Sequence, residues 1–113
     1  MEVRDRRHVD LLLLAAATEG PASGRELIDL VRERSDGIFV LSLRIVVREV
    51  HRLTNERLMR VTGNGRVRRY AVTPLGQRVL AMRRREWEAL SHGLDGVLGA
   101  ADDIDRGRPT RAE

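Results

Sequence analysis

A basic helical segment followed directly by a basic hairpin, between Ser42 and Val72, constrains the fold of this chain more than any other feature. In the first part, apolar residues recur every three or four positions from Ile45 to Leu53, and basic residues fill the remaining surface, as in an amphipathic helix. In the second part, apolar and basic residues alternate on both sides of a Gly-Asn-Gly turn, which predicts a two-stranded hairpin. This order is typical of a winged helix-turn-helix.

The residues before this pair predict two helices that support it. The segment from Asp5 to Thr18 carries a leucine-rich stripe that is wider than one core face needs, and Gly20-Pro21 ends it. Ser23 and Glu26 have the spacing of a capping box, which predicts the start of a second helix that ends near Ser35. We therefore expect an α+β fold that is mostly α.

A long last helix is predicted to begin at Thr73-Pro74, because Thr suits the N-cap and Pro the first helical position. We expect a winged-helix domain over residues 1–73, a C-terminal dimerisation helix over 74–100 and a disordered tail over 101–113. Asp10, within the leucine stripe of the first helix, is expected to face solvent.

The last helix is longer than a domain of this size can cover, so part of its apolar seam needs another chain. A symmetric homodimer is the simplest way to supply one. The wide leucine stripe of the first helix is expected to join the contact. The residues predicted for dimerisation are Leu12, Leu80, Leu90, Leu94 and Val97.

Composition excludes several classes of site. The formal net charge is +4, and every basic residue other than the three His is Arg. A GC-rich coding background explains the Arg-only composition, whereas selection for phosphate or base recognition would explain only the Arg residues on a contact face.

Without cysteine the chain has no disulfide and no thiolate metal site. The apolar run after the N-terminus is too short to span a bilayer and lacks a signal-peptide pattern, so we expect a cytoplasmic protein.

The placement of the positive charge predicts contact with duplex DNA. Basic side chains of the helix are expected in the major groove or on phosphate, and those of the hairpin along the backbone or minor groove. For the helix alone, an ordinary solvated basic face is the alternative. The residues predicted at DNA are Arg44, Arg48, His51, Arg52, Arg66 and Arg68.

Catalysis has little support in the sequence. The histidines lie on separate segments without metal-ligand spacing, and no nucleophile-elbow, zincin, P-loop or dinucleotide-binding pattern occurs. We expect no enzyme activity, no metal and no cofactor.

Several segments, in order, resemble the PadR-like transcriptional regulators. The leucine-rich first helix leads into a G-P-x-x-G-x-E-L segment at residues 20–27. The R-L-x-x-x-x-L-[IL] step of the family is approached at 52–59, where Met59 takes the last position, and a [LV]-T-x-x-G start of the last helix follows at 72–76. The resemblance covers about Leu11 to Leu98.

This resemblance implies a winged helix-turn-helix homodimer that binds a palindromic operator and usually represses. The short form, with one C-terminal helix, resembles the branch that senses small apolar or aromatic ligands at the dimer interface. In that branch a tryptophan of the last helix stacks on the ligand, and Trp87 stands at the matching place; dimer packing is the alternative role for this side chain. Val47 and Arg25 stand where the family commonly has Tyr, so operator sequence does not carry over.

We therefore expect a homodimeric, ligand-relieved repressor that binds duplex DNA. A winged-helix protein interaction module that has lost DNA binding, and a constitutive DNA-binding regulator without ligand, remain the alternatives.

Overall fold

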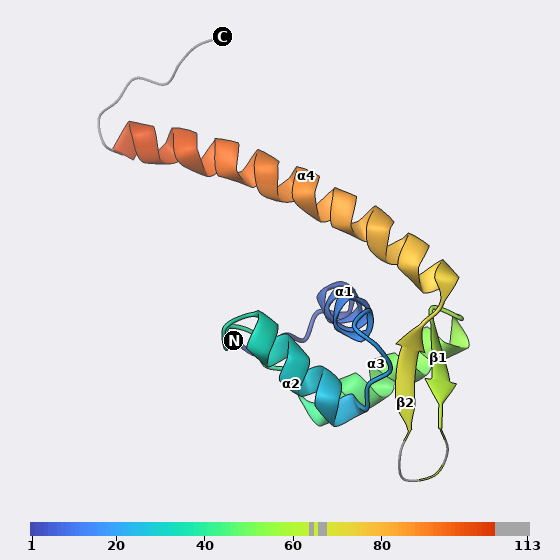
Figure 1. The fold of residues 1–113 in the computed structure, drawn as a ribbon. Helices are drawn as coiled ribbons and strands as arrows, with labels where there is room; N and C mark the ends of the chain where they lie inside the picture. The colour runs from blue at the N-terminus through green and yellow to red at the C-terminus, as the bar shows by residue number, and fades with distance from the viewer. Residues whose placement is uncertain (64, 66–67, 106–113) are drawn as a thin grey trace. The chain divides into compact units, whose positions relative to one another are not determined.

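The computed structural model describes residues 1–63, 65 and 68–105. It contains three short helices, a two-stranded antiparallel sheet and a long last helix (Figure 1). The elements are α1 (Arg6–Ala17), α2 (Gly24–Arg34), α3 (Leu43–Asn55), β1 (Met59–Thr62), β2 (Arg69–Val72) and α4 (Pro74–Asp105). The α+β, mostly α fold expected from the sequence is confirmed.

The starts of the first three helices follow from side-chain caps. Asp5 accepts hydrogen bonds from the first turn of α1, and Ser42 accepts one from the Ile45 N–H in α3. Ser23 and Glu26 form the predicted capping box of α2, with both reciprocal bonds present. These caps satisfy N–H groups that have no partner within a helix, and each contributes about 1 kcal/mol.

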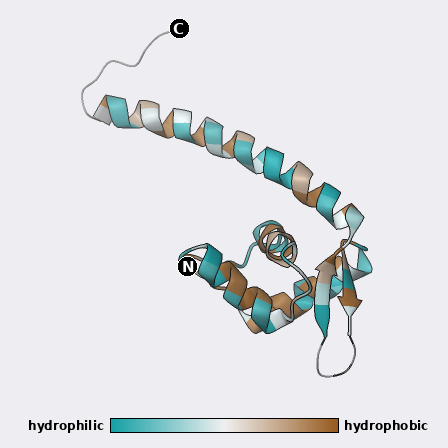
Figure 2. Ribbon diagram, in the orientation of Figure 1, coloured by the Kyte–Doolittle hydropathy of each residue, from teal (hydrophilic) through white to brown (hydrophobic). Residues whose placement is uncertain are grey.

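Helices α1, α2 and α3 enclose one hydrophobic core, to which Leu58 and Met59 of the hairpin also belong. Figure 2 shows apolar residues on all three of these helices. The residues that are fully buried in it include Val9, Leu13, Leu14, Leu27, Val46 and Leu53.

Helix α3 turns sharply into the hairpin. Arg57 adopts a positive φ of 63°, its N–H donates to the Thr54 carbonyl at 3.0 Å, and the Leu58 N–H donates to the Leu53 carbonyl at 2.9 Å. This pair of bonds is a Schellman motif, which closes the last turn and redirects the chain. The hairpin therefore begins directly after α3, as predicted.

The hairpin is tied to the start of α2. Its register pairs Met59 with Val72 at one end and Thr62 with Arg69 at the other. Tyr70 also exchanges two backbone hydrogen bonds with Ala22, at 2.8 and 3.1 Å. The chain before α2 thus supports the free edge of β2.

The last helix differs from the expectation at its far end. Helix α4 continues to Asp105, so residues 101–105 are helical and the prediction of a disordered tail from residue 101 is wrong for them. Residues 106–113 lie outside the described part of the chain. Among the described residues, no helix is long and apolar enough to cross a membrane.

The chain divides into two compact units, Met1–Ala81 and one that begins at Met82. The first unit thus extends past residues 73 and 74, where the sequence predicted the end of the winged-helix domain. Val79 and Leu80 explain the difference, because both pack against the core of the first unit.

Candidate nucleic-acid interface

Helix α3 presents an exposed basic face within the first unit. Arg44, Arg48 and His51 are exposed, at spacings of four and three residues that place them on one side of the helix. Val47 lies among them with 54 % of its surface exposed. The opposite side buries Val46, Val50 and Leu53 in the core, which fixes the direction in which the basic side chains project.

The hairpin adds positive charge beside this helix in the chain. Arg60, Arg68 and Arg69 are exposed, while Arg66 lies outside the described residues. Arg69 forms an ion pair with α2, because its Nε lies 4.0 Å from a carboxylate oxygen of Glu26. Hydrogen bonds from Ser23, and to a smaller extent the charge of Arg69, hold the pKa of Glu26 below its ordinary value. Arg68 is thus the predicted wing contact that the structure places on the surface.

Arg52 does not project toward solvent as expected for a phosphate contact. Its guanidinium is bonded to Asp10 of α1, to Glu49 at 3.2 Å and to Glu56 at 2.8 Å, and the side chain is only 19 % exposed. Partial burial lowers the pKa of Arg52, but hydrogen bonds and charges of the carboxylates, Asp10 first, outweigh burial and raise it above its usual value. Arg52 therefore links α1 to α3.

The same ion pair corrects the expectation for Asp10. This residue was predicted to face solvent, but it is 2 % exposed and bonded to Arg52. Glu49 is the second buried carboxylate, and its burial was not predicted from the sequence. Both positions repeat with the buried stripes of their helices, Asp10 with Leu13 and Leu14, and Glu49 with Val46 and Leu53. That periodicity was the available signal for both.

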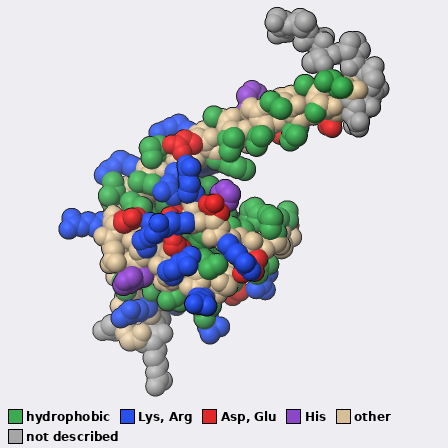
Figure 3. Space-filling view, turned by 180° about the vertical axis from the view of Figure 1, so that it is seen from behind, with side chains coloured by type: hydrophobic (Ala, Val, Ile, Leu, Met, Phe, Trp, Pro, Cys, Tyr) green, Lys and Arg blue, Asp and Glu red, His purple; other side chains and the backbone are tan. Residues whose placement is uncertain are grey.

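Figure 3 shows one face of the molecule, on which Arg side chains are spread over the first unit with acidic side chains among them. The positive charge is therefore partly compensated within the chain, and the exposed guanidinium groups matter more than the net charge.

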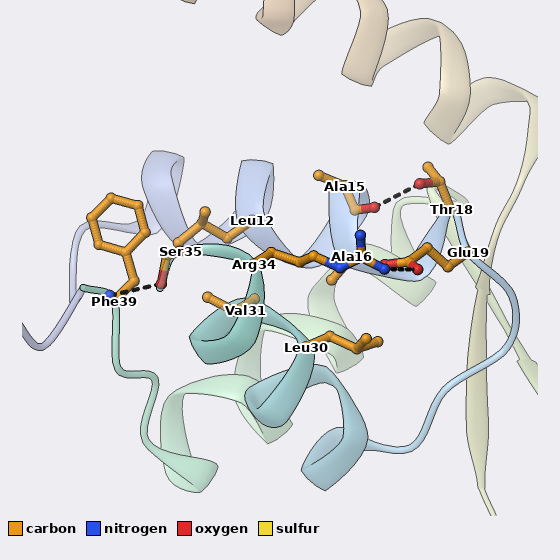
Figure 4. Close-up of a pocket in the computed structure, with 10 residues that line it drawn as sticks. All are labelled: Leu12, Ala15, Ala16, Thr18, Glu19, Leu30, Val31, Arg34, Ser35 and Phe39. Atoms are coloured by element: carbon orange, nitrogen blue, oxygen red, sulfur yellow. Dashed lines mark hydrogen bonds and ion pairs between the residues drawn. The ribbon is translucent and has the colours of Figure 1, made fainter. Parts of the chain in front are cut away.

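A hollow of about 530 Å³ lies between α1 and α2 (Figure 4). Leu12, predicted to take part in dimerisation, lines it together with Leu30 and Phe39. An ion pair between Arg34 and Glu19 closes one part of its wall. Leu12 is half-buried here, so part of its side chain remains open to a partner.

The second unit is a helix with an uncovered apolar seam. Trp87, Leu90, Leu94 and Val97 are 51, 54, 46 and 69 % exposed. The longer α4 extends this seam, since Ala101 follows Leu94 and Ile104 follows Val97 at the same seven-residue repeat. Leu80 and Leu12 differ from the other residues predicted for dimerisation, because both already pack on the core of the first unit.

Nothing in the described residues forms a metal site, since no group of three or more His, Asp or Glu side chains comes together there. The exposed basic face of α3 and the hairpin remain the main candidate for function.

Solved structures with this fold include three close matches in shape. The chain is similar to a transcriptional regulator from Clostridium thermocellum, with a TM-score of 0.72, 24 % identity and coverage of 80 % of this chain and 90 % of that chain. It is similar to a PadR family transcription regulator from Clostridium difficile R20291 (TM-score 0.69, 23 % identity, coverage 80 % and 98 %). It is also similar to a PadR family transcriptional regulator from Eggerthella lenta DSM 2243 (TM-score 0.66, 26 % identity, coverage 82 % and 84 %).

These matches confirm the winged-helix fold and the resemblance to PadR-like regulators. All three proteins are described as regulators of transcription, in agreement with the expectation that the chain is not an enzyme. No protein-family model and no curated protein matches the sequence.

Proposed function

We propose, on the premise that the chain has the fold of the PadR-like transcriptional regulators, that it is a DNA-binding regulator of transcription that acts as a homodimer. The observation that carries the proposal is the exposed row of Arg44, Arg48 and His51 on α3, which is followed directly by an Arg-rich hairpin. Helix-turn-helix proteins place such a helix in the major groove.

The proposed contacts divide by role. Arg44, Arg48 and His51 face the major groove, where Arg side chains form bidentate bonds to guanine. Arg68, and Arg66 from the sequence, meet the phosphate backbone and give affinity without sequence choice. Arg52 is left out, because its guanidinium is occupied by carboxylates of the chain itself.

Binding to duplex DNA from upstream of the chain's own gene, compared with shuffled DNA across a salt series, tests the proposal. We expect tighter binding to the first DNA, with log affinity falling steeply as log salt rises. An Arg44→Ala, Arg48→Ala double variant should lose most of this preference, because each lost base contact costs about 1 to 3 kcal/mol.

Arg85→Ala is the matched control, since it removes a charge from an exposed position on α4 that lies off the apolar seam. Unchanged affinity and preference in the double variant would remove α3 from the contact surface. Absence of binding to either DNA at low salt would instead favour a winged-helix protein interaction module.

The homodimer is supported by the exposed seam of α4. A run of large apolar side chains at a seven-residue repeat is costly in water and is covered in coiled-coil pairs. In a symmetric dimer two copies of α3 would face half-sites about 34 Å apart, which matches one turn of DNA. Leu12, at the hollow between α1 and α2, is proposed as a further contact.

A Leu94→Glu variant should sediment as a monomer at concentrations where the unchanged chain is a dimer, because the charge would be buried in the seam. Trp87 is the only Trp, so its emission should shift to the red as the partner is lost. His92→Glu places the same charge on the exposed helix surface off the seam and should leave the dimer intact. Equal sedimentation of both variants would contradict the proposal that the apolar seam of α4 forms the dimer interface.

Relief of repression by a small apolar or aromatic ligand is the second part of the proposal, and the half-exposed Trp87 supports it. A ligand held against this side chain would change how the two last helices pack and so the spacing of the two α3 helices. In the same fluorescence experiment, an aromatic ligand should quench the dimer and not the Leu94→Glu monomer. A broad set of ligands with no effect on emission or DNA affinity would favour a constitutive regulator.

A further inference from the structure

The buried carboxylate of Glu49 gathers guanidinium groups from two helices. Its oxygens lie 3.4 Å from Nε of Arg6 in α1, 3.7 Å from Nε of Arg48 and 3.2 Å from Nε of Arg52. The Glu49 side chain is 2 % exposed, whereas those of Arg6 and Arg48 are both 65 % exposed. The buried carboxylate of Glu49 therefore pairs with two exposed side chains, Arg6 and Arg48, that are far apart in the sequence.

This arrangement places the first residue of α1 beside the basic face of α3. Two guanidinium groups that share one carboxylate must lie near each other, and their repulsion is offset by the charge between them. Arg52 uses Asp10 and Glu56 as well, so it is held mainly by other groups. The two exposed side chains keep net positive charge that faces solvent.

We propose that Arg6 is a phosphate-binding residue of the DNA surface and that Glu49 positions it next to Arg48. This inference rests on the proposed function. Arg6 belongs to α1 and not to the helix proposed for the groove, so its natural partner is the phosphate backbone at the edge of that groove.

The geometry suits a phosphate. Arg6 approaches Glu49 through Nε, and its terminal amino groups belong to a side chain that is mostly exposed. These groups form the planar fork that binds phosphate oxygens in pairs, and a guanidinium held in place loses less entropy when it binds.

Arg6→Gln tests the proposal in the full chain, with the DNA and salt series described above. We expect the variant to bind specific and shuffled DNA more weakly by a similar factor, roughly 3- to 10-fold at low salt. The slope of log affinity against log salt should fall by about 1, as for one lost phosphate contact. Ethylation of one phosphate in each half-site should interfere with binding of the unchanged chain and no longer with binding of Arg6→Gln.

Two further variants separate this role from a structural one. Arg6→Lys keeps the charge and should restore the salt slope while binding stays weaker than in the unchanged chain, because the planar fork is gone. Arg85→Gln removes the same charge from an exposed position on α4 and should change neither quantity.

An unchanged slope and an unchanged ethylation pattern in Arg6→Gln, with DNA binding intact in the unchanged chain, would overturn the assignment of Arg6 alone. Failure of the unchanged chain to bind DNA at all would overturn the proposed function and this inference with it.

Discussion

Gly76→Ala is expected to destabilise the first unit by at least about 3 kcal/mol, since the nearest atom that the added methyl group meets belongs to the backbone, which cannot move aside as a side chain can. A Cβ at this position would lie 2.0 Å from the Leu58 carbonyl oxygen and 2.8 Å from Cγ1 of Val72. The Leu58 carbonyl is itself held by the Thr73 N–H at 3.1 Å. The clash therefore cannot be relieved by a change of rotamer.

The position of Gly76 explains why the expected effect is so large. Thr73 accepts a hydrogen bond from the Gly76 N–H at 3.0 Å and donates one to the Arg57 carbonyl at 2.6 Å. These bonds seat the start of α4 against the turn between α3 and β1. Moving the first turn of α4 away from Leu58 would break this joint, which also supports the hairpin.

Urea unfolding followed by circular dichroism measures the loss, with the free energy extrapolated to water. Gly93→Ala is a matched control, because Gly93 lies in the same helix and a Cβ there meets nothing within 4 Å. That variant should be neutral or gain up to about 1 kcal/mol from better helix propensity. A loss below about 1 kcal/mol in Gly76→Ala would show that the start of α4 can shift away from the turn between α3 and β1 at little energetic cost.

Gly76 also illustrates what the sequence could and could not reveal. The resemblance to PadR-like regulators drew attention to the glycine, but its cause, close approach to a backbone carbonyl from an earlier turn, depends on tertiary packing. Helix starts were predictable because Asp5, Ser23 and Ser42 act through local hydrogen bonds. The end of α4 was not, since the glycines near residue 99 cost helix propensity without preventing a helix.

The candidate site was predicted unevenly for a similar reason. Exposed residues of an amphipathic helix follow from its period, so Arg44, Arg48 and His51 were found from the sequence. Asp10 and Glu49 were not predicted to be buried, because charged residues are rarely buried unless paired. The partner of Asp10, Arg52, lies on another helix, although Glu49 has Arg52 three residues on in its own helix. Arg52 was assigned to DNA from its type, although its partners decide its role.

Arg52→Met is expected to cost about 3 to 5 kcal/mol in unfolding free energy, because it removes the guanidinium that joins the buried carboxylate of Asp10 in α1 to Glu49 in α3. Glu49 keeps Arg6 and Arg48 nearby, so the loss comes mainly from Asp10. An Asp10→Leu, Arg52→Met double variant should recover much of the stability, since removing both charges also removes their desolvation cost.

Arg84→Met is the control for loss of an ion pair as such, because Arg84 pairs with Glu88 four residues on and both side chains are exposed. Exposed pairs of this kind contribute about 0.3 to 0.5 kcal/mol, so this variant should stay close to the unchanged chain. If Arg52→Met and Arg84→Met lost similar amounts of stability, the bonds from Arg52 to Asp10 and Glu49 would not hold α1 to α3.

DNA binding by the folded fraction of Arg52→Met separates the two roles considered for this residue. If Arg52 only joins α1 to α3, the variant should keep the salt slope of the unchanged chain once affinity is corrected for the unfolded fraction. A slope lower by about 1 would show that Arg52 leaves its carboxylates to bind a phosphate, as its position in the sequence first indicated. We expect the unchanged slope, because phosphate would have to replace the bonds to Asp10, Glu49 and Glu56.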